Sequence, residues 1–114
     1  MNRAVVVLEI FSGRADPTWT LDPRQTADFR GRLAALPSSR EQALPAEAWL
    51  GYRGVHVSFS DAAGAHGEIA DVRHGRVAYR GRVLQDVGRA LERALLAMAP
   101  HELAPLVREV EESF

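Results

Sequence analysis

Cysteine and lysine are both missing from this chain of 114 residues. Without cysteine, disulfide bridges, thiolate zinc sites, iron–sulfur clusters and cysteine nucleophiles are excluded. The basic residues are all arginine, and the formal net charge is −1. A chain so balanced lacks the summed positive field with which general nucleic-acid binders and acidic-membrane binders attract their partners.

Long apolar runs are also missing. No stretch approaches the roughly 18 apolar residues of a membrane span, so we expect no membrane association. The opening run MNRAVVVLEIF is short and is followed by no small-residue cleavage site, which favours a strand over a signal peptide. We therefore expect a cytoplasmic protein.

Motifs with a known chemical mechanism are absent as well. The sequence has no glycine fingerprint for dinucleotides or phosphates and no nucleophile elbow. Its four histidines, His56, His66, His74 and His101, stand singly, without the spacing of a helical metal motif. His56 has no acidic neighbour in sequence to orient it, which indicates a polar sheet face. We expect no catalytic constellation, no metal site and no cofactor.

Hydrophobic periodicity predicts a single α+β domain over residues 1–114. Alternating or continuous apolar patterns predict strands near 3–11, 55–60, 68–73 and 76–80. Helical spacing predicts helices that start at Asp22, at Asp86 and near Pro105. The order β-α-β-β-β-α-α, with a right-handed first crossover, predicts a mixed sheet of about four strands. The helices are expected mainly on one face of this sheet.

The first predicted strand is apolar on both faces except at Glu9. This pattern is typical of an interior strand covered on both sides, by a helix, a loop or another copy of the protein. A buried Glu9 in a cleft would be a candidate general base. The alternative is that it reaches solvent or pairs with an arginine.

The loop after this strand is the first candidate site. It leads from the carboxyl end of a strand to a helix start, where anions tend to bind. Gly13 allows close backbone approach, Arg14 offers a planar fork for a carboxylate or phosphate, and Trp19 can stack. The alternative is that Arg14 fixes the loop by pairing with Glu9 or Asp16 while Trp19 fills the core.

The segments IFSGRADPTW, at residues 10–19, and LGYRG, at residues 50–54, resemble a group of small proteins of unknown function. These carry Phe-Ser-Gly-Arg-Pro-Asn-Pro-x-Trp after an opening strand and Leu-Gly-Tyr-Arg-Gly further on. Ala15 and Asp16 stand where the group has Pro-Asn. The resemblance implies that the two irregular segments meet, with Arg14, Trp19, Tyr52 and Arg53 on one surface.

The predicted hairpin over residues 73–82 gathers four arginines and Tyr79. Such a ribbon is one way to bind nucleic acid. The neutral net charge instead favours a solvated hairpin whose arginines guard an edge strand, so nucleic-acid binding is only the third functional hypothesis.

The leading hypothesis is a non-enzymatic binding or accessory module that self-associates through the loop 12–19 and the segment 49–54, with an unknown protein as partner. The second is a small enzyme or sensor of an anionic small molecule. It would use Arg14 and Arg53 as anion clamps and Glu9 or His56 as acid or base. The candidate binding residues are Glu9, Ser12, Gly13, Arg14, Trp19, Tyr52 and Arg53.

Overall fold

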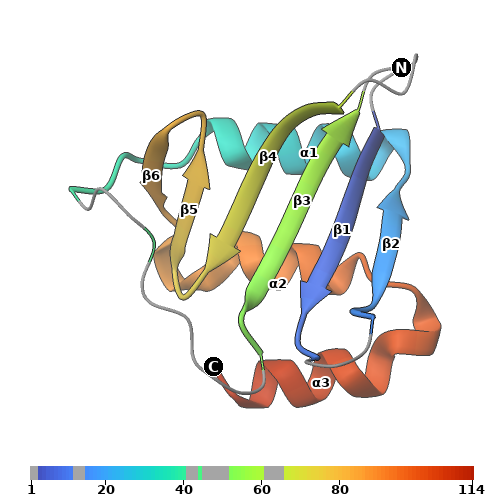
Figure 1. The fold of residues 1–114 in the computed structure, drawn as a ribbon. Helices are drawn as coiled ribbons and strands as arrows, with labels where there is room; N and C mark the ends of the chain where they lie inside the picture. Colours follow the sequence, from blue (N-terminus) through green and yellow to red (C-terminus); the bar gives the residue numbers. More distant parts are fainter. Residues whose placement is uncertain (1–2, 12–14, 41–43, 45–51, 61–65) are drawn as a thin grey trace.

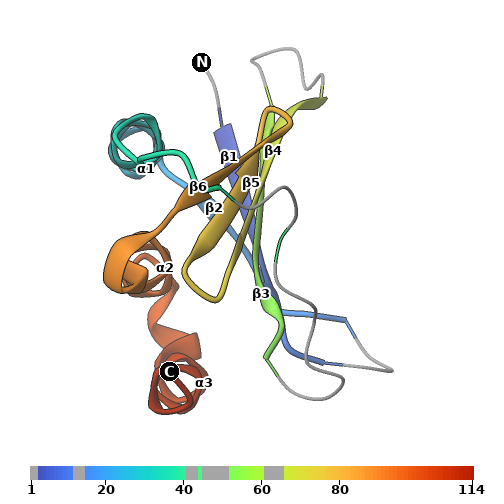
Figure 2. The same ribbon diagram turned by 90° about the vertical axis from the view of Figure 1, so that its left-hand side faces the viewer.

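A six-stranded antiparallel sheet carries three helices on one face in the computed structural model (Figures 1 and 2). The structure describes residues 3–11, 15–40, 44, 52–60 and 66–114. The sheet order is β2-β1-β3-β4-β5-β6, and every neighbouring pair is antiparallel. The strands are β1 (Arg3–Glu9), β2 (Thr18–Leu21), β3 (Gly54–Ser60), β4 (His66–Arg73), β5 (Arg76–Tyr79) and β6 (Arg82–Gln85). The helices are α1 (Pro23–Ala34), α2 (Ala90–Ala97) and α3 (Ala104–Glu112), and short 3-10 turns η1 (Val87–Arg89) and η2 (His101–Leu103) precede the last two.

The predicted α+β class is confirmed, but the prediction of a mixed sheet of about four strands in the order β-α-β-β-β-α-α is wrong. The first error is β2, which the sequence analysis placed within a loop and a helix start. Because β1 turns straight back into β2, α1 connects β2 to β3 and leaves β3 antiparallel to β1. The second is β6, which follows β5 through a two-residue turn in which Arg80 and Gly81 both have positive φ, the backbone of a tight hairpin.

The predicted start of the first helix is confirmed. The Asp22 carboxylate accepts a hydrogen bond from the Gln25 amide at 2.7 Å, and the Gln25 side chain accepts one from the Asp22 amide at 3.0 Å. This reciprocal capping box satisfies amide groups that have no partner within the helix. Phe29 and Leu33, four residues apart and therefore on one face of α1, are buried in the core.

The second helix starts later than predicted. The Asp86 carboxylate does bind free amides, those of Leu91 at 2.7 Å and Glu92 at 3.0 Å. However, Gly88 and Arg89 adopt positive φ, so regular helix begins only at Ala90. Val87, directly after the predicted start at Asp86, is 71% exposed because it precedes this break.

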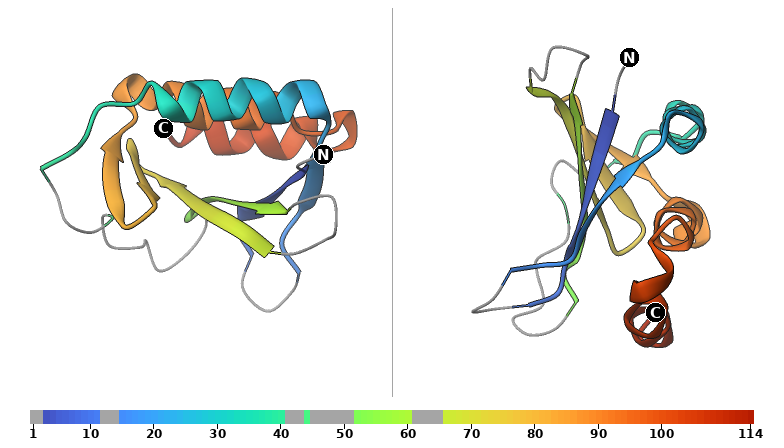
Figure 3. Two further views of the ribbon diagram at one scale, coloured as in Figure 1. Left: turned by 90° about the horizontal axis from the view of Figure 1, so that it is seen from above. Right: turned by 90° about the vertical axis from the view of Figure 1, so that its right-hand side faces the viewer.

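The helices leave one sheet face open. Ala4, Val6 and Leu8 of β1 are fully buried beneath the helices, whereas Val5, Val7 and Glu9 lie half-buried on the other face. None of the described helices covers that second face (Figure 3), so the cover that the apolar pattern of β1 predicted is not one of these helices. Among the described helices, none has the length and apolar character needed to cross a membrane.

Candidate functional site

Three polar residues meet on the open face because of the strand register. His56 on β3 pairs with Val7 on β1 and with Asp71 on β4. Glu9 lies two residues beyond Val7, on the same face of β1. Neighbouring strands are only about 4.8 Å apart, so this register brings a glutamate, a histidine and an aspartate together. We call Glu9, His56 and Asp71 the open-face cluster.

The imidazole of the cluster is held by a carboxylate. His56 Nδ1 lies 2.7 Å from Asp71 Oδ1, and the two side chains are 31% and 34% exposed. A carboxylate only accepts hydrogen bonds, so Nδ1 is the donor in this contact. An ion bound by both His56 Nδ1 and Asp71 would take the place of this proton, because a metal-binding imidazole nitrogen must be deprotonated. The proton of the neutral ring would then be on Nε2.

Glu9 completes a set of three ligand atoms. One imidazole nitrogen and one oxygen from each carboxylate all lie within 4.8 Å of one another. Around an ion with bonds of about 2.1 Å, neighbouring ligand atoms stand about 3 to 4 Å apart. The three ligand atoms of the open-face cluster lie near that spacing, so these three residues fit a metal ion.

A pocket adjoins the open-face cluster. Its volume is about 430 Å³, and it shares Asp71 with the cluster. Ala78, which pairs with Asp71 in the sheet, and Ile69 on the same face of β4 contribute apolar surface. The lining residues are Leu44, Ile69, Asp71, Ala78, Tyr79, Arg80, Gly81, Arg82 and Val83.

Arg53, a predicted anion clamp, is bound within the protein. Its guanidinium donates to the Phe11 carbonyl at 3.1 Å and lies 3.6 Å from the Asp16 carboxylate. Its backbone amide donates to the Glu9 carbonyl at 2.7 Å, extending the β1–β3 pairing. Arg53 therefore ties the end of β1 to the following loop. The two irregular segments meet at this contact, but Trp19 and Tyr52 do not share one surface with Arg53.

Asp16 organises that loop through one oxygen. Its Oδ1 accepts hydrogen bonds from the amides of Ile10 at 3.0 Å and Phe11 at 2.7 Å. An asparagine oxygen can accept the same two bonds, because neither requires a charge.

We expect Asp16→Ala to lower the free energy of unfolding by about 1 to 3 kcal/mol, because two half-buried amides lose their acceptor. Asp16→Asn is expected to cost less than about 1 kcal/mol, since only the partly exposed contact with Arg53 is weakened. Urea unfolding of both variants measures the difference. Equal losses in the two variants would show that the charge, and not the acceptor, holds the loop.

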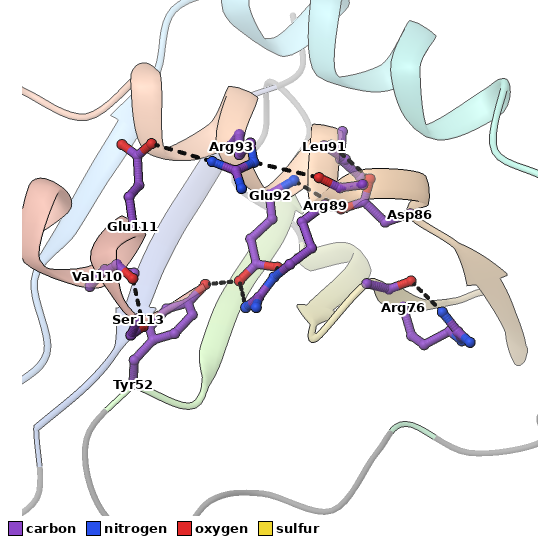
Figure 4. Close-up of polar contacts among 12 residues, drawn as sticks. Tyr52, Arg76, Asp86, Arg89, Leu91, Glu92, Arg93, Val110, Glu111 and Ser113 are labelled. Carbon is purple, nitrogen blue, oxygen red and sulfur yellow. Dashed lines mark hydrogen bonds and ion pairs between the residues drawn. The ribbon is translucent and has the colours of Figure 1, made fainter.

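Tyr52 points to the helices and not to the open face. Its hydroxyl donates to the Glu92 carboxylate, which also accepts two bonds from Arg89 at 2.9 and 3.0 Å (Figure 4). Glu92 is fully buried, and the Arg89 guanidinium lies 3.7 Å from the ring centre of Phe114. This buried network is saturated with internal partners, which indicates a structural role.

Burial raises the pKa of the Tyr52 hydroxyl far above its ordinary value, and the neighbouring Glu92 carboxylate raises this pKa further. In the unfolded chain a tyrosine loses its proton near pH 10. Above that pH the folded state holds more protons than the unfolded state, so stability that is fully present below pH 10 is lost as the pH rises.

For this residue we expect the free energy of unfolding to fall by about 1.4 kcal/mol for each pH unit above about 10. Chemical unfolding between about pH 9 and about pH 11 measures this slope, and Tyr52→Phe is expected to remove the part due to Tyr52. Tyr79→Phe is the matched control. The pKa of Tyr79 is also raised, but Tyr79 is less buried, so this variant is expected to change the slope less than Tyr52→Phe does. An unchanged slope in Tyr52→Phe would contradict the assignment.

The remaining predicted binding residues divide between the core and the undescribed part of the chain. Trp19 is 5% exposed and belongs to the core on the helix side of the sheet. Ser12, Gly13 and Arg14 lie outside the described residues. Trp19, Tyr52 and Arg53 therefore occupy three different environments, and of the seven predicted binding residues Glu9 is the one that lies in the open-face cluster.

The basic hairpin carries its arginines on both faces of the sheet. Arg80 binds Glu68 and lies 5.2 Å from the ring centre of Tyr79, while Arg82 donates to the Ser38 hydroxyl. The hydrogen bonds from Arg80 lower the pKa of the Glu68 carboxyl below its usual range. These internal contacts favour the solvated hairpin over a nucleic-acid surface.

Asp71 is the member of the cluster that the sequence analysis missed. It lies 15 residues from His56 in the chain, so no local spacing connects the two. The signal was the alternation of two consecutive strands, because antiparallel pairing of such strands places their outward-facing residues opposite one another.

Comparison of the chain with protein-family models, with curated proteins and with solved structures found no match.

Proposed function

We propose that the protein is a small metal-dependent binding domain whose site is the open face of the sheet, where Glu9, His56 and Asp71 bind one divalent transition-metal ion. The observation that carries this proposal is the convergence of three ligand atoms within 4.8 Å. These residues come from three adjacent strands, and sites on such rigid elements hold their geometry better than sites on loops.

The ligand set favours a particular class of metal. One imidazole nitrogen with two carboxylate oxygens suits zinc and other first-row transition metals such as manganese and cobalt, whereas magnesium and calcium prefer oxygen ligands alone. Catalytic zinc sites keep three protein ligands and leave a position open for another molecule. Three ligands from the described residues therefore fit a site that binds an exogenous molecule through its metal.

Isothermal titration with Zn²⁺, and with Co²⁺ as a spectroscopic substitute, tests the proposal. Wild-type protein is expected to bind one ion of either kind, with Mg²⁺ binding much more weakly. His56→Ala is expected to weaken zinc binding by at least about 100-fold, and Asp71→Asn by about 10- to 100-fold. His101→Gln is the control, because it removes an exposed imidazole from η2, outside the cluster.

Two results would overturn the proposal. One is an absence of stoichiometric zinc binding by wild-type protein that circular dichroism shows to be folded. The other is wild-type zinc affinity in His56→Ala, which would place the ion elsewhere. Circular dichroism of each variant separates loss of the site from loss of the fold.

Self-association, the leading expectation from the sequence, stays a separate prediction. The feature that favours it is Ile69, a large apolar side chain on the open face that is 49% exposed. Native mass spectrometry distinguishes the two ideas, because a dimer without adduct supports self-association and a monomer carrying one metal ion supports the binding domain.

A further inference from the structure

The pocket beside the open-face cluster indicates what the metal would bind. This inference rests on the proposed metal site and names the class of ligand that completes it. Asp71 belongs both to the cluster and to the pocket wall. A molecule bound to the ion would therefore have to extend past only the Asp71 side chain to reach the pocket.

The pocket continues the site along one row of the sheet. His56, Asp71, Ala78 and Val83 stand side by side on consecutive strands, and adjacent strands are about 4.8 Å apart. Beyond Asp71, the residues of this row, Ala78 and Val83, are apolar. Ile69 adds exposed apolar surface next to it, and Leu44 contributes to the lining. The site thus has a polar end and an apolar end.

The open coordination positions of the ion favour an anionic oxygen ligand at the polar end. A divalent ion bound by Glu9 and Asp71 is neutral overall, because its two charges balance the two carboxylates. Among the described residues, the other charged side chains that line the pocket are Arg80 and Arg82. Arg80 is paired with Glu68, and Arg82 donates to the Ser38 hydroxyl. Both arginines lie at the β5–β6 end of the pocket and not beside the ion.

We propose that the metal-loaded protein binds a small oxygen-chelating anion, of the carboxylate class, whose apolar body lies in the pocket over Ile69 and Ala78. The anionic oxygens would occupy the open positions of the ion. This replaces the anion clamps Arg14 and Arg53 of the sequence-based hypothesis with the metal itself, since Arg53 is already bound to Phe11 and Asp16.

Two hydroxamates that differ only in their apolar part test this inference on zinc-loaded protein. Benzohydroxamate carries a phenyl ring for the pocket, and acetohydroxamate carries a methyl group. We expect benzohydroxamate to bind at least about tenfold more tightly, because burial of the ring removes apolar surface from water. Its amide NMR shifts are expected at Ile69 and Ala78. Protein without zinc is expected to bind neither compound measurably.

Two pocket variants supply the controls. Ala78→Phe fills the pocket, and Ile69→Ser removes apolar surface at an exposed position where the fold tolerates change. Both are expected to keep wild-type zinc affinity and to lose most of the preference for benzohydroxamate. Equal affinities for the two hydroxamates in zinc-loaded wild-type protein would overturn the inference and leave the metal site standing. Failure of wild-type protein to bind zinc would overturn both proposals.

Discussion

Glu92→Ala is expected to lower the free energy of unfolding by about 3 to 5 kcal/mol. The Glu92 side chain is fully buried and accepts hydrogen bonds from Arg89 and Tyr52. Removing the carboxylate leaves a guanidinium that is 21% exposed without its counter-charge. A partly buried charge without a partner is among the costliest defects that a single substitution creates.

Urea or thermal unfolding measures this loss, and an exposed ion pair provides the control. Arg93 and Glu111 lie 3.9 Å apart, with side chains 50% and 40% exposed. Glu111→Ala is therefore expected to cost less than about 1 kcal/mol. If Glu92→Ala were as mild as Glu111→Ala, the buried network would not hold the first turns of α2 and the segment before β3 together.

Gly54→Ala is expected to lower the free energy of unfolding by about 2 to 4 kcal/mol. Gly54 has φ of 129°, a conformation that residues with a Cβ rarely adopt, and an added Cβ would lie 2.5 Å from the Val72 carbonyl oxygen. Gly54 also pairs with Glu9 and stands two residues before His56. The backbone shift that relieves the clash therefore displaces the metal site too.

For Gly54→Ala we expect both the unfolding midpoint and the zinc affinity to fall. Gly31→Ala is the matched control, because a Cβ at that exposed helix position meets nothing within 4 Å. It is expected to stabilise the protein by up to about 1 kcal/mol through helix propensity and to leave zinc binding unchanged. Wild-type stability and zinc affinity in Gly54→Ala would show that the β1–β3 junction tolerates a side chain.

The sequence correctly predicted the elements that are determined by residues close together in the chain. The capping residues Asp22 and Gln25 marked the start of α1, and the alternation of Val55, Val57 and Phe59 marked the buried side of β3. The segment Thr-Trp-Thr-Leu has the same alternation, with Trp19 and Leu21 buried. It was missed because its four residues lie directly before a strong helix start.

The open-face cluster depends on long-range register, which local patterns do not contain. The β3–β4 pairing shifts between Ser58 and Ser60. If the pairing of Ser60 with His66 continued without that shift, His56 would stand opposite Ala70 and not Asp71. A one-residue irregularity therefore decides whether the imidazole meets its carboxylate, and its position cannot be inferred from composition or periodicity.

Anomalous X-ray diffraction from zinc-soaked crystals tests the central claim most directly. The account predicts one strong peak on the sheet face opposite the helices, within about 2.0 to 2.2 Å of an imidazole nitrogen of His56 and of oxygens from Glu9 and Asp71. An unoccupied cluster at saturating zinc, or a peak only at other histidines such as His101, would contradict it.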